Sequence, residues 1–180
     1  MSGSRRSGEG EVSRLTPLPE GPARGRLLVA AAVASRTSEE LARFSGTDGR
    51  HEGLVLWLGR RVEGDVMITA LAAPPVEHTW GSVRIGHRAV GLTSKAARRA
   101  GVSVLVQVRS HPGNDTRHSD GDDQLVLLPY EGMFSLVLGR YGDEVIEPHR
   151  DLGLHQFQDG GWVLVRPVDG SLLVVPTVIA

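Results

Sequence analysis

The stretch VLVQVRSHPGNDTRHSDGDDQ, residues 104–124, decides the fold because it joins an apolar run directly to a polar loop. Residues 102–110 are rich in Val and Leu, which predicts a strand in the centre of a sheet. Pro112 and Gly113 then end this strand. Because side chains two apart in a strand point to the same face, we expect Arg109 and His111 to project together from its end.

The regions on both sides of this strand predict a single α/β domain. Helices are expected at residues 26–44, as one helix or as two short helices broken near Thr37 and Ser38, and at residues 83–102, ending at Gly101. Further strands are expected at residues 52–60, 65–74, 134–142, 161–168 and 171–179. This order favours a mixed, curved sheet flanked by helices. The domain is predicted to cover residues 25–180, after a flexible leader at residues 1–24.

Composition limits the possible partners and compartments. The chain has 180 residues, the size of one domain, with 20 basic and 21 acidic side chains and a net charge of -1. This balance disfavours general nucleic-acid binding. The absence of cysteine excludes disulfides, thiolate zinc sites and a cysteine nucleophile. The leader has no signal-peptide core, and the apolar stretch Leu27–Ala34 is far short of the roughly 20 residues that cross a bilayer. We therefore expect a cytoplasmic protein without membrane contact.

The polar loop has the spacing of a metal site in which one ligand is missing. Seven residues separate His111 from Ser119, and two more separate Ser119 from Asp122. A short turn would bring Asp122 back toward His111. The alternative is a surface loop in which Asp and Ser cap turns. The chain contains no G-x-S-x-G string, so it lacks the nucleophile motif of a serine hydrolase.

These residues resemble the JAB/MPN domain of JAMM-type zinc isopeptidases, in the form found in bacteria. The family pattern is His-x-His, seven residues, Ser, two residues and Asp, and this chain matches it at His111, Ser119 and Asp122. The family also has a glutamate upstream, before a G-x-L-x-x-G-like segment, and Glu52 stands there. Arg109 stands where the family has its first histidine. The similarity extends from about residue 27 to residue 140.

The resemblance implies a JAB/MPN-like, cytidine deaminase-like fold and a zinc-dependent reaction. Zinc would be held by His111, Asp122 and the residue at position 109, with water as the fourth ligand. Glu52 would act as the general base toward that water, and Ser119 would donate to the oxyanion. The implied substrate bond follows the C-terminal glycine of a ubiquitin-like protein. Activating or conjugating enzymes of the same pathway are the further partners that it implies.

Arg109 is the departure from the family pattern. A guanidinium has no lone pair for a metal, and at about 4 Å it would repel a dication by on the order of 8 kcal/mol at an effective dielectric of about 20. Structural zinc gains only about 10–16 kcal/mol in finger peptides. One possibility is that Arg109 turns away and another ligand enters, with His118 as the nearest substitute and His51 as a poorer one. A second possibility is that zinc binds weakly. The third is an inactive enzyme in which Arg109 pairs with Asp122 or Glu52 and replaces the charge of the metal.

Two hypotheses follow from these residues. The first is a zinc-dependent isopeptidase whose activity Arg109 reduces or removes. The second is a metal-free, catalytically inactive MPN-type module that binds a ubiquitin-like protein or scaffolds a complex. In either case Trp80, in the stretch EHTWGS, is a candidate for lining a groove that takes the extended tail of the partner.

Overall fold

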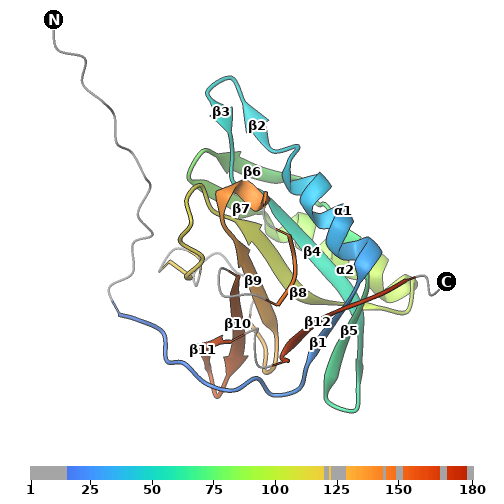
Figure 1. The fold of residues 1–180 in the computed structure, drawn as a ribbon. Helices are drawn as coiled ribbons and strands as arrows, with labels where there is room; N and C mark the ends of the chain where they lie inside the picture. The colour runs from blue at the N-terminus through green and yellow to red at the C-terminus, as the bar shows by residue number, and fades with distance from the viewer. Residues whose placement is uncertain are drawn as a thin grey trace, which may run out of the picture.

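An eight-stranded, curled mixed sheet forms the centre of the fold in this computed structural model (Figure 1). The structure describes residues 16–119, 122, 129–143, 145–148, 152–166 and 170–177. The strands lie in the order β11-β10-β9-β8-β4-β5-β1-β12. Their bounds are β1 Leu27–Ala30, β4 Leu54–Val62, β5 Asp65–Ala72, β8 Ser103–Ser110, β9 Phe134–Leu138, β10 Gly153–Gln158, β11 Gly161–Val165 and β12 Leu172–Val175. β8 lies between antiparallel β4 and parallel β9, so it is a central strand as predicted.

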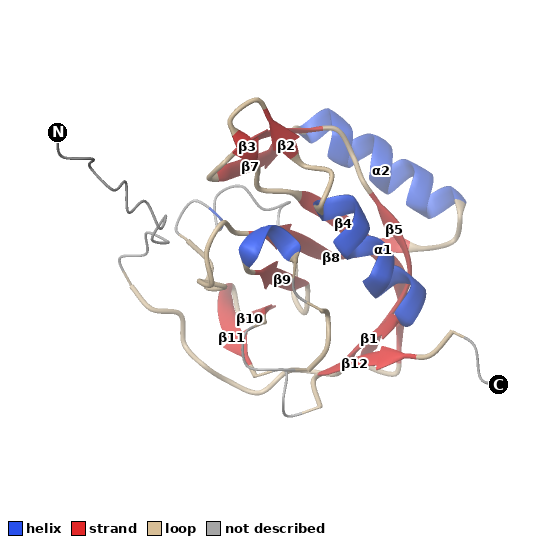
Figure 2. Ribbon diagram, turned by 45° about the horizontal axis from the view of Figure 1, so that its top comes forward, coloured by secondary structure: helices blue, strands red, loops and turns tan. Residues whose placement is uncertain are grey.

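Two helices and two small hairpins complete the described part of the chain (Figure 2). Their bounds are α1 Ala31–Leu41, β2 Ser45–Gly46, β3 Gly49–Arg50, β6 Val76–Thr79, β7 Ser82–Ile85, α2 His87–Arg99 and the 3₁₀ turn η1 Arg140–Gly142. The prediction of a mixed sheet flanked by helices is therefore confirmed. No helix of the described segments is long and apolar enough to span a bilayer.

The core is divided between the two faces of the sheet because successive side chains of β4 point in opposite directions. Val55 and Trp57 belong to the large cluster that α1 covers. Leu54 and Leu56 belong to a smaller cluster, where they pack against Val83 of the β6–β7 hairpin. Arg109 pairs in register with Leu54, so its side chain lies on this second, partly polar face.

Two predictions about the first helix region need correction or resolution. Residues 27–30 form strand β1, not the start of a helix, because their backbone pairs in parallel with both β5 and β12. This pairing outweighs the helix preference of Leu and Ala. The helix that follows is not broken at Thr37. The Thr37 hydroxyl donates to the carbonyl of Val33 and accepts a 2.7 Å hydrogen bond from the indole of Trp57.

The later element predictions were wrong at two boundaries, and they missed one strand. The second helix begins at His87 and not at residue 83, because residues 82–85 pair with β6 as strand β7. The strand predicted at residues 134–142 ends at Leu138 and is followed by η1. Strand β10 was not predicted at all. Its residues Gly153–Gln158 include two glutamines and a histidine, so the alternation of apolar and polar residues is weak.

Part of the predicted leader contacts the sheet. The carbonyl of Pro19 accepts from Leu164 of β11, and Gly21 donates back to the same residue. Gln156 exchanges two side-chain hydrogen bonds with the backbone of Arg24. Flexibility of the leader stays a prediction for residues 1–15, which lie outside the described residues.

Candidate active site

The ends of β4 and β8 bring Glu52 and Arg109 to the same place. Ser110 donates its backbone N–H to the carbonyl of Gly53, and its hydroxyl accepts from the Gly53 N–H at 2.9 Å. Glu52 also donates its backbone N–H to Thr79 of β6 at 2.9 Å. These bonds fix the backbone on both sides of Glu52, directly beside the end of the central strand.

His111 is held by both backbone and side-chain hydrogen bonds. Its N–H donates to Leu138 of β9, and its carbonyl accepts from Tyr141. The imidazole Nδ1 lies 2.9 Å from the carbonyl of Asp115, which can only accept, so Nδ1 carries a proton. The other nitrogen, Nε2, lies 3.3 Å from Oδ2 of Asp122. The turn that follows β8 therefore points the imidazole at Asp122.

Ser119 and Asp122 form a reciprocal pair across three residues. The Ser119 N–H donates to Oδ2 of Asp122 at 2.7 Å, and the Asp122 N–H donates to the Ser119 hydroxyl at 3.0 Å. This is the geometry of a capping box, in which each side chain satisfies the other residue's backbone. It returns the carboxylate to His111, as the spacing of the loop predicts.

Arg109 lies between the two carboxylates of the site. One of its terminal nitrogens forms an ion pair with Oδ1 of Asp122. The other lies 3.7 Å from Oε2 of Glu52. The exposed fractions of Arg109 and Asp122 are both 2%, and that of Glu52 is 5%. The structure thus brings together Glu52, Arg109, His111 and Asp122, with Ser119 attached through Asp122.

The electrostatics of the site follow from burial and from these pairs. Burial opposes the charge on Asp122, but the hydrogen bond with His111 and the charge of Arg109 hold the pKa of Asp122 well below its usual range. Burial likewise opposes a charge on His111, but Asp122 reverses this and raises the pKa of His111. At Glu52 burial prevails over the nearby cations, and the pKa of Glu52 is raised. The site therefore favours a charged Asp122 beside the guanidinium of Arg109 and the imidazole of His111.

A zinc ion does not fit the residues as they are arranged. The guanidinium of Arg109 has no lone pair and is already paired with Asp122, the expected ligand. His111 is also engaged, because its Nδ1 lies 2.9 Å from the carbonyl of Asp115 and its Nε2 lies 3.3 Å from Oδ2 of Asp122. Among the described residues, no group of three His, Asp or Glu side chains is placed to hold a metal ion.

His118, the substitute ligand considered above, is turned toward β9 and β10. It is fully buried, and its Nε2 lies 2.8 Å from the hydroxyl of Ser135. Its ring stacks on His155, with centroids 4.0 Å apart. Ligation by His118 would therefore require this hydrogen bond and this stacking to break.

Sequence reasoning missed Ser110 and Tyr141, which support and border the site. The role of Ser110 depends on the pairing of β4 with β8, which the sequence alone does not give. Tyr141 donates its backbone N–H to the carbonyl of His111 and its hydroxyl to the carbonyl of Trp80 at 3.1 Å. Trp80 is 53% exposed, and Thr79 before it accepts the backbone N–H of Glu52. Trp80 and Tyr141 thus lie on segments that border the site, and the groove-lining role of Trp80 stays a prediction.

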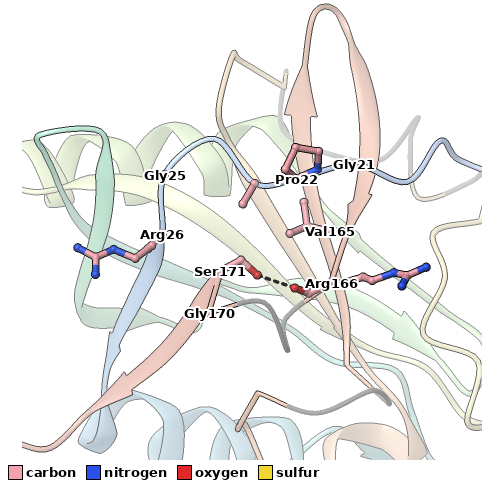
Figure 3. Close-up of a pocket in the computed structure, with 9 residues that line it drawn as sticks. Gly21, Pro22, Gly25, Arg26, Val165, Arg166, Gly170 and Ser171 are labelled. Atoms are coloured by element: carbon pink, nitrogen blue, oxygen red, sulfur yellow. Dashed lines mark hydrogen bonds between the residues drawn. The ribbon is translucent and has the colours of Figure 1, made fainter.

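A separate hollow of about 280 Å³ lies between the segment around Pro22 and the end of β11 (Figure 3). Figure 3 shows the side chains of Arg26 and Arg166 pointing away from it. The Ser171 hydroxyl donates to the carbonyl of Arg166. The walls of this hollow therefore present mainly glycine, proline and apolar groups. The hollow has no part in the candidate active site.

Comparisons with known proteins find a relative in sequence and a solved structure of similar fold. The probable metalloprotease y4jG of Sinorhizobium fredii is 28% identical over 106 residues, which span 57% of this chain and 64% of that protein. The solution structure of protein DSY2949 from Desulfitobacterium hafniense has a TM-score of 0.63 at 15% identity, over 84% of this chain and 94% of that one. No protein-family profile matches. The chain is thus similar over just over half its length to a protein named as a probable metalloprotease, and it shares its mixed α/β fold with DSY2949.

Proposed function

We propose that this chain is a module of the JAB/MPN type whose candidate active site holds no metal, and that it binds the C-terminal tail of a ubiquitin-like protein without cleaving it. The observation that carries this proposal is the buried ion pair between Arg109 and Asp122, with Glu52 at 3.7 Å. A guanidinium occupies the position from which the family's first histidine would hold the metal. The site is therefore complete without a metal ion.

Charge balance supports this view. Two carboxylates, Glu52 and Asp122, are buried at the site, and buried charges need partners. Arg109 supplies a positive charge between them, and Asp122 raises the pKa of His111, so the site favours a proton on this ring as well. A zinc ion would have to displace the guanidinium and so break its buried ion pair with Asp122.

The chemistry of the set supports binding and not hydrolysis. Arg109 and the His111 ring are hydrogen-bond donors, and neither can lower the pKa of a bound water as a metal does. Beside them the exposed indole of Trp80 offers a flat apolar surface for a peptide. We infer that an extended tail lies along Trp80 toward Glu52, and that a ubiquitin-like protein, with its activating or conjugating enzymes, is the partner.

The test compares the wild-type chain with Arg109→His. The probe is a fluorescent peptide ending in Gly-Gly, used free and joined through its C-terminal glycine to a lysine side chain. The wild type is expected to bind the free peptide and to leave the joined one intact. Arg109→His is expected to bind one more zinc per chain than the wild type and to cleave the joined peptide. Cleavage should be lost again in Arg109→His/Glu52→Gln, which keeps the metal.

Two results would overturn the proposal. Wild-type cleavage that a chelator abolishes would show that Arg109 does not close the site. Failure of the wild type to bind the free peptide, or binding that Trp80→Ala leaves unchanged, would remove the assigned partner or its position on Trp80.

A zinc-dependent isopeptidase is the second candidate, and the name of the Sinorhizobium relative, a probable metalloprotease, favours it. Glu52, His111, Ser119 and Asp122 all stand at the positions that the JAB/MPN pattern requires. In this alternative Arg109 leaves the site and zinc takes its place. The chelator experiment on the wild type separates the two candidates directly.

A further inference from the structure

A second histidine cluster lies outside the candidate active site, where the β2–β3 hairpin meets β6. His51 follows the hairpin, and His78 is in β6. Their Nδ1 atoms face each other at 2.8 Å, with ring centroids 5.0 Å apart. Phe44 packs its ring edge-on against His78 at 5.1 Å and accepts the backbone N–H of His51. The two imidazoles are thus positioned by the fold and not by chance proximity of surface side chains.

Asp48 fixes the tautomer of His51. Its Oδ1 lies 2.6 Å from Nε2 of His51, and the hydrogen bond with His51 lowers the pKa of Asp48. Because Asp48 is a carboxylate, Nε2 is the protonated nitrogen of a neutral His51. The lone pair of His51 is then on Nδ1 and points at His78. A carboxylate bound to one nitrogen, with the other directed at a shared point, is the arrangement that orients metal-binding histidines.

The space around His51 is also specific to its ring. A side-chain carbon at Gly46 would lie 2.4 Å from Cε1 of His51, so glycine leaves the room that the imidazole occupies. His51 is buried, whereas His78 is half-buried and reached by solvent. A site between them would therefore be open on the His78 side.

We propose that the Nδ1 atoms of His51 and His78 bind a divalent transition ion such as zinc, with Asp48 supporting His51. Without the ion, Nδ1 of His78 donates its proton to Nδ1 of His51. When the ion binds, this proton moves to Nε2 of His78, so that ring stays neutral and its Nδ1 lone pair faces the ion. Zinc bonds to imidazole at about 2.0–2.1 Å, which in a tetrahedron separates two nitrogens by roughly 3.3 Å. The rings need to part by only about half an ångström from 2.8 Å. No third His, Asp or Glu of the described residues joins this pair, so water completes the shell.

The ion would fix the border of the candidate active site. His51 directly precedes Glu52, and Glu52 donates its backbone N–H to Thr79, the residue after His78. A bond between the two histidines therefore joins the hairpin to β6 on both sides of the Glu52 backbone. This inference does not depend on the proposed function. It rests on the side chains of Asp48, His51 and His78, and none of these belongs to the ion pairs of Arg109.

The experiment titrates the full chain with zinc in a calorimeter and compares matched variants. The wild type is expected to bind one equivalent, and the control His87→Ala, an exposed histidine at the start of α2, is expected to do the same. His78→Ala should lose this binding. Asp48→Asn should weaken it by about 10–100-fold, the usual effect of losing a supporting carboxylate. Circular dichroism of each variant confirms that it folds.

A second measurement needs no substitution. Long-range ¹H–¹⁵N spectra of the wild type should show zinc-dependent shifts of the Nδ1 resonances of His51 and His78. The proposal is overturned if the wild type binds no zinc, if His78→Ala binds it as well as the wild type, or if only the His111 ring responds. In that case the two rings share a proton and nothing more. Because His111 is observed in the same spectrum, failure here is distinct from failure of the proposed function.

Discussion

The buried carboxyl group of Glu52 lowers the stability of the folded protein when it is charged. Burial raises its pKa more than His111 and Arg109 lower it. A group whose pKa is raised on folding binds its proton more tightly in the folded state, so the stability it contributes at low pH is lost as the pH rises through the folded pKa. Above that pH, the charged carboxylate lowers the free energy of unfolding.

We therefore expect Glu52→Gln to stabilise the protein at neutral pH. The glutamine does not titrate, so its advantage over the wild type should be small near pH 4, close to the unfolded pKa of about 4.3, and should increase toward pH 7. Urea unfolding at several pH values measures this difference. Glu77→Gln, at an exposed position of β6, should stay within about 0.5 kcal/mol of the wild type throughout. A Glu52→Gln variant that is less stable at pH 7 would contradict the expectation.

Arg109 and Asp122 should behave as one energetic unit. Breaking a buried ion pair by removing one partner costs about 3–5 kcal/mol, because the other charge is left unpaired. We expect a loss of this size in Arg109→Met and in Asp122→Asn, measured as the free energy of unfolding. The double variant Arg109→Met/Asp122→Asn should lose clearly less than the sum of the two. Additive losses would mean that the pair does not form.

The spacing of the loop, read from the sequence alone, predicts which side chains meet but not how they pair. His111, Ser119 and Asp122 follow the family pattern, and Glu52 stands on the neighbouring strand. From the sequence, the side chain of Arg109 could either lie in the site or turn away from it. Only the packed structure shows the contacts with Asp122 and Glu52, because these depend on the register of β4 with β8. The catalytic and ligand roles of these residues stay predictions.

The loop that carries His111 and Ser119 is held against β10 by a close backbone approach. A side-chain carbon at Gly153 would lie 1.8 Å from the carbonyl oxygen of Thr116, so only glycine allows the loop to lie this close. Gly161, in the partner strand β11, has open space at the same position. The loop is thus positioned by a strand that the sequence did not reveal.

Gly153→Ala should therefore disturb the candidate site, and Gly161→Ala should not. The added methyl group forces either β10 or the loop to move, with an expected loss of about 1–3 kcal/mol in the free energy of unfolding. Movement of the loop would also separate Asp122 from Arg109. Asp122→Asn should therefore cost less stability in the Gly153→Ala variant than in the wild type. Gly161→Ala is the matched control on the same hairpin. Equal stability of the two variants would show that Thr116 does not lie against Gly153.

Strands with a long apolar pattern were predicted well. Short strands were predicted poorly, because their pairing with neighbouring strands determines whether the segment is a strand or part of a helix. β4, β5 and β8 have long runs of aliphatic residues, and their boundaries were predicted to within a few residues. β1 and β7 are four residues each and were assigned to helices. A four-residue apolar run fits either structure, so its partners in the sheet determine the outcome. β10 was missed because Gln156 and His155 are buried polar residues whose partners come from distant segments.

The sheet ends in β11 on one side, and the segment before β1 covers part of that edge. Pro19 and Gly21 bond to Leu164 through the backbone, and Glu20 forms a parallel bridge with the same residue. Unpaired strand edges promote association between chains, so this cover protects the monomer. The segment also carries the partners of the fully buried amide of Gln156.

Deletion of residues 1–24 should consequently destabilise the domain and promote self-association. Gln156 would lose its two hydrogen bonds to the backbone of Arg24, and each unsatisfied buried group costs about 1–3 kcal/mol. Thermal unfolding and sedimentation velocity measure the two effects. Arg24→Ala is the control, because it keeps both backbone bonds and removes only exposed ion pairs with Glu131 and Asp159, worth at most about 1 kcal/mol each. If Arg24→Ala destabilises the protein as much as the deletion does, the charges and not the backbone contacts hold this segment, and the account of Gln156 fails.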